Sequence, residues 1–144
     1  MTTAYDPSNI FAKILRGEIP SAGVYEDDAV VAFMDVMPQA AGHTLVVPKA
    51  ASRNLLDADA KALGPLMAVV QKVARAVKAA FAADGVTIQQ FNEPAAGQTV
   101  FHLHFHVIPR HEGVPLKPHA GKMEDAAVLA ANAEKIKRAL RASP

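Results

Sequence analysis

Histidine and bulky apolar residues alternate in the segment 99–109, TVFHLHFHVIP, and this alternation constrains the fold more than any other feature of the sequence. Successive side chains of a β-strand point to opposite faces, so residues two apart share a face. A strand in this segment would therefore place His102, His104 and His106 together. The other face carries four apolar residues that we expect to pack on the core: Phe101, Leu103, Phe105 and Val107. The histidines would then face a cleft, a partner or solvent.

Turn residues and apolar alternation predict four further strands. Residues 24–35, VYEDDAVVAFMD, indicate a β-hairpin that turns at Asp27 and Asp28. The segments HTLVVPK (43–49) and VTIQQFN (86–92) indicate one strand each. Together with the histidine segment, these predictions give a sheet of five strands.

Apolar residues at helical spacing predict three helices. A helix of about two turns is expected within residues 8–20, capped by Ser8 or Asn9. A long helix is expected from about 57 to 83 and a C-terminal helix from about 124 to 141. The inward positions predicted for the long helix are Leu63, Met67, Val70, Ala74, Val77 and Phe81. Those predicted for the C-terminal helix are Leu129, Ala133, Ile136 and Leu140.

The predicted order is one helix, three strands, a long helix, two strands and a last helix. Strands joined by hairpins and interrupted by one long helix are typical of an α+β domain with a mainly antiparallel sheet. A chain of 144 residues is long enough for one domain with a substantial core and too short for two of ordinary size. We therefore predict a single domain spanning residues 1–144.

Composition and charge exclude several classes of function. The net charge of +1 gives no basic field for nucleic acid or a membrane surface, so neither is an expected partner. The chain has no cysteine, which excludes disulfides and thiolate metal sites and fits a reducing compartment. No apolar run approaches the roughly 20 residues needed to span a bilayer, and the start, MTTAYDPSN, lacks the features of a signal peptide. We expect a cytoplasmic protein.

Three interpretations of the histidine row remain open at this point. It could be a solvated strand face, although such faces ordinarily use Lys, Glu, Thr and Ser. It could bind a metal ion through two of its histidines and His43. All three row histidines could hardly share one ion, because the outer two start about 13 Å apart on a flat strand, whereas zinc needs its nitrogens at about 2.0–2.1 Å. No carboxylate ligand is evident beside the row.

The third interpretation is catalytic. A neutral imidazole is nucleophilic at physiological pH because its unperturbed pKa is about 6.5. His104 has an imidazole on each side that could orient it or pass a proton to a leaving group. Gly97, Gln98 and Thr99 lie just upstream and could supply donors to the oxygens of a phosphate. Attack by nitrogen on phosphorus would give a phosphoramidate that water later hydrolyses.

The stretch HLHFHVI resembles the His-φ-His-φ-His-φ-φ signature of the histidine triad (HIT) superfamily, where φ is an apolar residue. Three more segments are similar to family segments in family order: IFAKILRGEIP, VYEDDAVVAFMDVMPQAAGHTLVVPK and FNEPAAGQTVFHLHFHVIPR. The likeness covers about residues 9–110, and the front half is most similar to bacterial HIT proteins and the Hint branch. It implies a HIT-like α+β fold, with a C-terminal extension and its helix over about 111–144.

The resemblance implies an enzyme that hydrolyses or transfers purine nucleotides at the α-phosphate, as a purine nucleoside phosphoramidase does. His104 would be the nucleophile on phosphorus, and the backbone carbonyl of His102 would fix its other ring nitrogen. His106 would lie near the phosphate and leaving group, and His43 would complete the histidine network. No cofactor and no metal ligand are implied.

The resemblance also implies a set of substrate contacts. Gln98 and Thr99 would contact the phosphate and leaving-group side, and Asn92 would face the same pocket. Asp35 would accept hydrogen bonds from both ribose hydroxyls, which suits the two oxygens of a carboxylate. Six apolar residues would line the pocket of the base: Ile10, Phe11, Ile14, Ile19, Phe33 and Leu45.

Two departures from the family pattern limit what the resemblance implies. Several bacterial relatives hold zinc with cysteines near the first segment, where this chain has Asn9 and Ala12, so structural zinc is not expected. The chain also continues past the row, and EPAAGQTV with Pro109-Arg110 is similar to the dinucleoside polyphosphate hydrolase branch. That activity and a non-enzymatic nucleotide-binding adaptor remain alternatives.

By analogy we expect a homodimer whose sheets join across a two-fold axis. His111 and His119 are interpreted as solvated.

Overall fold

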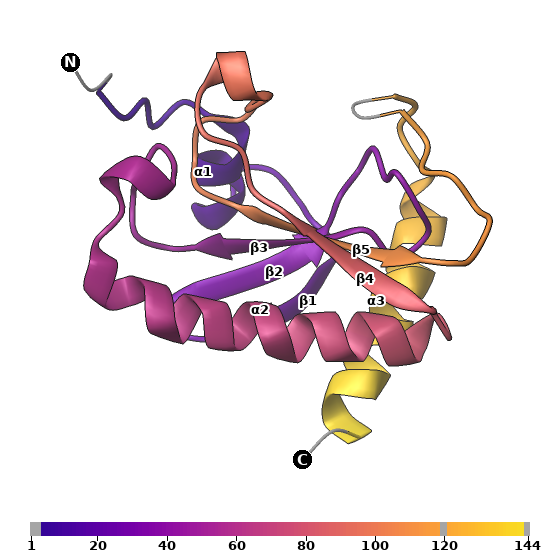
Figure 1. Cartoon of the computed structure of the whole chain (residues 1–144). Helices are drawn as coiled ribbons and strands as arrows, with labels where there is room; N and C mark the ends of the chain where they lie inside the picture. Colours follow the sequence, from indigo (N-terminus) through magenta and orange to yellow (C-terminus); the bar gives the residue numbers. More distant parts are fainter. Residues whose placement is uncertain (1–3, 119–120, 143–144) are drawn as a thin grey trace.

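The computed structural model describes residues 4–118 and 121–142, and a five-stranded antiparallel sheet forms its centre (Figure 1). The strands are β1 (Gly23–Glu26), β2 (Val30–Met34), β3 (Thr44–Pro48), β4 (Gly85–Gln89) and β5 (Phe105–Arg110). The α-helices are α1 (Ile10–Leu15), α2 (Ala60–Ala80) and α3 (Ala126–Ala142). Two short 3₁₀ turns, Leu55–Asp57 and Pro94–Ala96, lie in the loops. The predicted order of elements and the α+β class are confirmed.

The strands lie in the order β1-β2-β3-β5-β4, and each neighbouring pair is antiparallel. The predicted hairpin joins β1 and β2. Its turn holds because Asp27 accepts hydrogen bonds from the backbone N–H groups of Ala29 and Val30, both at 2.8 Å. At the other edge, β4 pairs only with β5 among the described strands, so one side of β4 is open.

The sheet separates two apolar layers, and β3 contributes to both. Val46 packs with the residues of α2 and α3 in the larger cluster, whereas Leu45 and Val47 pack with Phe11 of α1 in the smaller one. This alternation follows from the two-residue period of a strand. The two long helices thus cover one face of the sheet, and the short helix α1 lies against the other (Figure 1).

The helix predictions were right in number and partly wrong in detail. In α3, Leu129, Ala133 and Ile136 are buried as predicted. The stripe predicted for α2 was wrong at Met67, which is 43% exposed. The buried face of α2 consists of Leu66, Val69, Val70, Val73, Ala76 and Val77. Apolar residues surround much of this helix, so spacing alone left the orientation of its buried face open.

The strand predicted for residues 99–109 forms only from Phe105 onward. Before that point two other hydrogen bonds replace the ladder to β3. The backbone N–H of Leu103 donates to the carbonyl of Ser52 at 3.0 Å, and His102 Nε2 lies 2.8 Å from the carbonyl oxygen of Pro48. His102 and His104 therefore precede the strand, and only His106 belongs to it.

The apolar side of the same segment follows the prediction at three of four residues. Leu103, Phe105 and Val107 are buried in the larger cluster. Phe101 is only partly buried, and the guanidinium of Arg53 lies 4.1 Å from the centre of its ring. A cation over an aromatic face is a favourable contact at a partly exposed site.

None of the helices in the described part of the chain is both long and apolar enough to cross a membrane.

Gly42 holds the chain in the left-handed conformation, with φ of +96°, one residue before His43. A Cβ at this position would lie 2.6 Å from the ring of Phe81. We expect Gly42→Ala to lower the free energy of unfolding by about 1–3 kcal/mol through overpacking and strain. The control is Gly64→Ala inside α2, where a Cβ meets nothing within 4 Å and should raise the stability by up to about 1 kcal/mol. Urea unfolding of both variants checks this, and an unaffected Gly42→Ala would contradict it.

Candidate active site

A cavity of about 190 Å³ lies between α1 and the sheet. All six apolar residues predicted for a base pocket line it: Ile10, Phe11, Ile14, Ile19, Phe33 and Leu45. Four of the predicted polar site residues line it as well: Asp35, Thr99, His104 and His106. A mostly apolar cavity with a few polar groups at one end is the usual form of a small-molecule site.

The register of the sheet explains why the apolar wall of the cavity lies next to His106. Phe33 of β2 pairs with Leu45 of β3, and Leu45 pairs with His106 of β5. Paired residues of adjacent strands share a face, so the three side chains form a row on the face that α1 covers. Ile10 closes the row from α1 and is 44% exposed, which places an apolar side chain at the surface beside the cavity.

His104 is held in one tautomer by the backbone. Its Nδ1 lies 2.6 Å from the carbonyl oxygen of His102. A carbonyl only accepts hydrogen bonds, so Nδ1 carries the proton and the lone pair of the neutral ring is on Nε2. The ring is 7% exposed and packs edge-on against Phe11, with centroids 4.8 Å apart. The arrangement presents a nucleophilic tautomer in a tightly restricted position.

His43 and His106 form a second imidazole unit beside His104. The backbone N–H of Gln39 donates to His43 Nδ1 at 3.0 Å, so in the neutral ring the proton of His43 lies on Nε2. His43 Nε2 is 2.9 Å from His106 Nδ1 and 3.4 Å from Asp35 Oδ2, and the shorter distance identifies His106 as its acceptor. His106 then carries its own proton on Nε2. The ring of His106, which carries this donor, lies beside that of His104, with centroids 5.0 Å apart.

Asp35 stands next to this pair, which the sequence did not reveal. Its Oδ1 accepts from the backbone N–H of Met37 at 2.9 Å, while Oδ2 lies 3.4 Å from His43 Nε2 and 4.0 Å from His106 Nδ1. The expectation that no carboxylate lies beside the row was wrong. Ligand atoms of the three side chains lie within 4.8 Å of one another and could hold a metal ion. Such an ion would have to displace the proton shared by His43 and His106.

The loop that carries Asp35 and His43 is fastened by the C-terminal extension. The backbone N–H of Lys117 donates to the carbonyl of Gln39 at 2.8 Å, and that of Glu124 donates to the carbonyl of Val36 at 2.9 Å. The side-chain amide of Gln39 adds a bond of 3.2 Å to the carbonyl of Lys117. Gln39 thus joins the extension to the ring of His43.

The ring of His102 has a structural environment and does not line the cavity. It is 1% exposed, and its Nε2 donates to the carbonyl of Pro48 at 2.8 Å. Burial lowers the pKa of His102, and the bond to Pro48 opposes this only in part, so the neutral ring is favoured. The hydroxyl of Tyr5, 2.5 Å away, donates to Nδ1. The sequence singled out the carbonyl of His102 but gave no signal for Tyr5.

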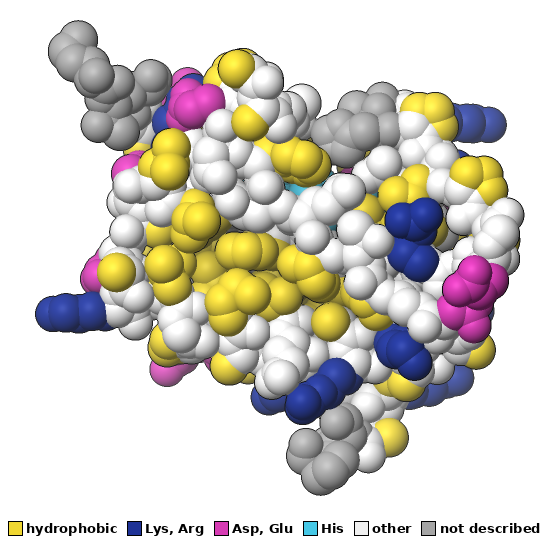
Figure 2. Space-filling model, in the orientation of Figure 1, with side chains coloured by type: hydrophobic (Ala, Val, Ile, Leu, Met, Phe, Trp, Pro, Cys, Tyr) yellow, Lys and Arg dark blue, Asp and Glu magenta, His cyan; other side chains and the backbone are white. Residues whose placement is uncertain are grey.

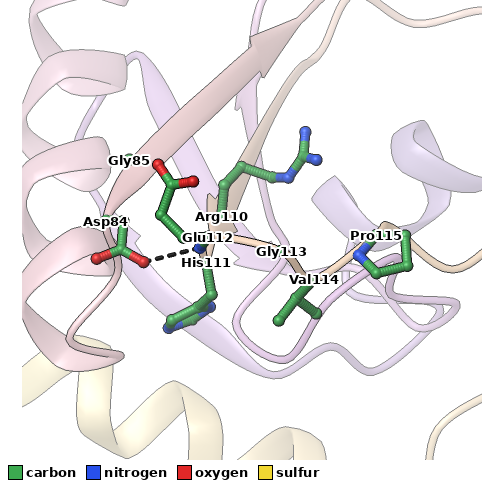
Figure 3. Close-up of a pocket in the computed structure, with 8 residues that line it drawn as sticks. All are labelled: Asp84, Gly85, Arg110, His111, Glu112, Gly113, Val114 and Pro115. Atoms are coloured by element: carbon green, nitrogen blue, oxygen red, sulfur yellow. Dashed lines mark hydrogen bonds between the residues drawn. The ribbon is translucent and has the colours of Figure 1, made fainter.

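A larger open cavity, about 500 Å³, lies where β4 begins and β5 ends (Figure 3). Its charged side chains do not converge, since Arg110 points away from Asp84 and Glu112 (Figure 3). His111 is exposed, as expected, and its Nε2 lies 3.0 Å from the carbonyl of Phe81. His119 lies outside the described residues. The smaller apolar cavity is therefore the stronger candidate site.

Comparison with known proteins agrees with this arrangement of histidines. Residues 16–113 match the family described as HIT domain. This chain belongs to the HIT family. A crystal structure of a Hit-like protein involved in cell-cycle regulation from Bartonella henselae is 60% identical, covers 94% of this chain and 99% of that one, and superposes with a TM-score of 0.89.

Two more distant relatives carry functional names. A hypothetical histidine triad nucleotide-binding protein from Sulfolobus tokodaii is 33% identical, with a TM-score of 0.84 over 92% of this chain and 91% of that one. Adenylylsulfatase HINT3 of Arabidopsis thaliana is 35% identical over 103 residues, which are 72% of this chain and 52% of that protein. The likeness to the plant enzyme is thus confined to about half of its length.

Two residues predicted to contact substrate, Gln98 and Asn92, bond to neighbouring loop residues, and their contact with a substrate stays a prediction. The side chain of Gln98 is buried and engaged by the loop: Nε2 donates to the carbonyls of Arg53 and Val100, and Oε1 accepts from Asn54 and from the backbone of Glu93. These bonds use its hydrogen-bonding capacity, so it braces the loop. Neither Gln98 nor Asn92 lines the cavity.

Asn92 is likewise committed to its neighbours. It accepts from the backbone N–H of Leu55 at 2.9 Å and exchanges two side-chain hydrogen bonds with Gln90. The ring centroid of Phe91, a residue that no feature of the sequence singled out, lies 5.7 Å from that of His106. Of the loop residues predicted to contact phosphate, Thr99 alone lines the cavity.

The region where some HIT relatives hold zinc does not fit a metal in this chain. Ala12 has no ligand atom. Asn9 Oδ1 accepts from the backbone N–H of Ala12, and Nδ2 donates to the hydroxyl of Tyr5 at 3.0 Å. A neutral amide engaged in this way is a poor substitute for thiolate, the soft ligand that zinc favours there.

The lowered pKa of His102 predicts a pH dependence of stability. The unfolded chain takes up a proton near pH 6.5, whereas the folded ring does so only at lower pH. The contribution of His102 to stability is therefore complete above pH 6.5 and lost progressively as the pH falls toward the folded pKa. We expect the difference in unfolding free energy between the native chain and His102→Gln to shrink between pH 7.5 and pH 5.5. A difference that stays constant in urea unfolding at the two pH values would contradict this.

Proposed function

We propose that this HIT protein is a hydrolase or transferase of purine nucleotides that cleaves phosphoramidate, ester or anhydride bonds at the α-phosphate. The hydrogen bond from His104 Nδ1 to the carbonyl of His102 carries the proposal, because it keeps the nucleophilic lone pair on Nε2 of a ring that lines the cavity. The apolar wall suits a purine base, and Asp35 at the polar end suits the ribose hydroxyls.

The reaction has two displacements at phosphorus. His104 Nε2 attacks the α-phosphorus, a P–N bond forms, and the bond from phosphorus to the leaving group breaks. The imidazole becomes a cation in this step, and its Nδ1–H bond to the His102 carbonyl stabilises the charge. Water then attacks the same phosphorus and gives a proton to the unit of His43 and His106, the P–N bond breaks, and nucleoside monophosphate is released with neutral His104.

The leaving group needs a proton, and the unit of His43 and His106 is placed to supply it. When the unit holds one extra proton, Asp35 at 3.4 Å from His43 Nε2 offsets the positive charge. His106 Nε2–H can then be transferred to the departing oxygen or nitrogen, and the two protons that remain leave His43 and His106 both neutral. Thr99 adds a hydroxyl donor at the same end of the cavity.

Removal of the nucleophile tests the proposal. His104→Ala should lower kcat/KM for an adenosine phosphoramidate by about 10³-fold or more, because no other ring can form the covalent intermediate. AMP should still bind, since the apolar wall and Asp35 are unchanged. Turnover is measured against a panel of adenosine and guanosine phosphoramidates, adenylyl sulfate and diadenosine polyphosphates. The control is His111→Ala, which alters an exposed histidine outside the cavity.

The panel also separates the alternatives. Preference for diadenosine polyphosphates would place the protein with the dinucleotide hydrolases. Tight AMP binding without turnover of any substrate would refute the hydrolase and favour an adaptor. Retained phosphoramidase activity in His104→Ala would refute the role of His104.

We also propose that the protein is a homodimer whose sheets join through β4. One side of this strand is open, and hydrophobic side chains gather over the face between α2 and β4 (Figure 2). Ile88 of β4 and Met67 of α2 are exposed by 42% and 43%. Exposed apolar surface of this kind is typical of an interface.

Charge placed on β4 tests the dimer. Ile88→Lys should convert the dimer to a monomer in light scattering coupled to size-exclusion chromatography, because a lysine is costly to bury in an apolar interface. The control is Val128→Lys, an exposed apolar residue on α3 that is 40% exposed. A monomeric native protein would contradict the proposal.

A further inference from the structure

The segment before α1 is hydrogen-bonded to the histidine loop through Tyr5. Its hydroxyl is 2.5 Å from His102 Nδ1, and the two rings pack edge to face with centroids 5.6 Å apart. The contact joins residues 97 positions apart in the chain. Because the opposite nitrogen of His102 donates to the carbonyl of Pro48, Nδ1 must be the acceptor and the hydroxyl of Tyr5 the donor.

Both ring nitrogens of the buried His102 thus have hydrogen-bond partners that are themselves held in place. Pro48 belongs to β3, and Tyr5 is in turn held by Asn9, whose amide donates to the phenolic oxygen at 3.0 Å. The ring of His102 has no freedom to rotate without leaving a buried polar atom unpaired, which is costly. The backbone of the same residue carries the carbonyl that binds His104 at 2.6 Å.

We propose that Tyr5 is a positioning residue for His104, acting through His102. Fixing the ring of His102 fixes the adjoining peptide unit, and that unit determines where His104 Nδ1 is anchored. The hydroxyl of Tyr5 therefore controls how accurately Nε2 meets phosphorus, although Tyr5 does not line the cavity. This inference rests on the proposed function, in which His104 attacks the nucleotide.

Asn9 connects the contact between Tyr5 and His102 to α1, which forms part of the wall of the cavity. Its Oδ1 caps α1 through the backbone N–H of Ala12, and its amide holds Tyr5. The helix that it caps carries Phe11, whose ring packs 4.8 Å from that of His104. One hydrogen-bonded cluster, Tyr5–Asn9–His102, thus connects the backbone anchor of His104 with the aromatic ring against which it packs.

The location of Tyr5 predicts which kinetic constant changes. Because it touches neither the cavity nor the bound base, its loss should leave ground-state binding unchanged and impair only the alignment of the attack. Tyr5→Phe should lower kcat for an adenosine phosphoramidate about tenfold, the effect expected for one lost buried hydrogen bond. KM and the Kd for AMP should remain within about twofold of the native values.

Tyr25→Phe is the matched control, because the chain has only these two tyrosines. Tyr25 lies in β1, donates to Asp27 Oδ2 at 2.6 Å and does not line the cavity. This variant should keep kcat. Asn9→Asp is the second test, since it retains the cap oxygen and removes the amide donor to Tyr5. Its carboxylate competes with His102 for the hydroxyl, so kcat should fall here as well.

A readout independent of turnover separates this inference from the proposed function. The Nδ1 proton of His104 sits in a short hydrogen bond and should give a low-field proton NMR resonance, assigned by its loss in His104→Ala. Tyr5→Phe and Asn9→Asp should shift or broaden this resonance, and Tyr25→Phe should not.

If the native chain proves inactive, the proposed function fails and the resonance still tests the contact. Native kcat and an unshifted resonance in folded Tyr5→Phe would overturn the role of Tyr5. If Tyr5→Phe does not fold, the same two results in Asn9→Asp would overturn it.

Discussion

The candidate site depends on one short hydrogen bond, from the ring of His104 to the main-chain oxygen of His102. Bonding to backbone fixes the tautomer without a charged partner, so the neutral ring of His104 has its lone pair on Nε2. The bond forms because residues 102–104 leave the ladder of the sheet and use the carbonyls of Pro48 and Ser52 as alternative acceptors. A regular strand would have engaged that oxygen in the sheet.

The fold was largely predictable because its signals are local. Apolar alternation and turn residues marked each strand, and α3 showed its buried face directly. Prediction from the sequence failed where one residue pattern is compatible with two structures. Met67 and Val70 in α2 are both apolar, and only packing on the sheet decides that the second is buried. The start of β5 was missed for a similar reason, since period-two alternation continues through His102 and His104 although the backbone hydrogen bonds do not.

The site could be predicted as a set of residues but not as a network. The family pattern led to the six apolar wall residues and to Asp35, and all of them line the cavity. It did not reveal that Gln98 and Asn92 bond to neighbouring loop residues, because a side-chain amide can serve a substrate or brace a loop and its position in the sequence does not distinguish the two. Tyr5 and Gln39 gave no signal at all, since each contacts a residue distant in the sequence, Tyr5 bonding to His102 and Gln39 to Lys117.

The backbone bonds from Lys117 and Glu124 to the loop of Asp35 have a consequence for regulation. A ligand that restrains this loop would also restrain the C-terminal extension. By thermodynamic reciprocity, release of the extension from the loop would then lower the affinity for that ligand by the same factor. The C-terminal extension thus supports one wall of the cavity without lining it.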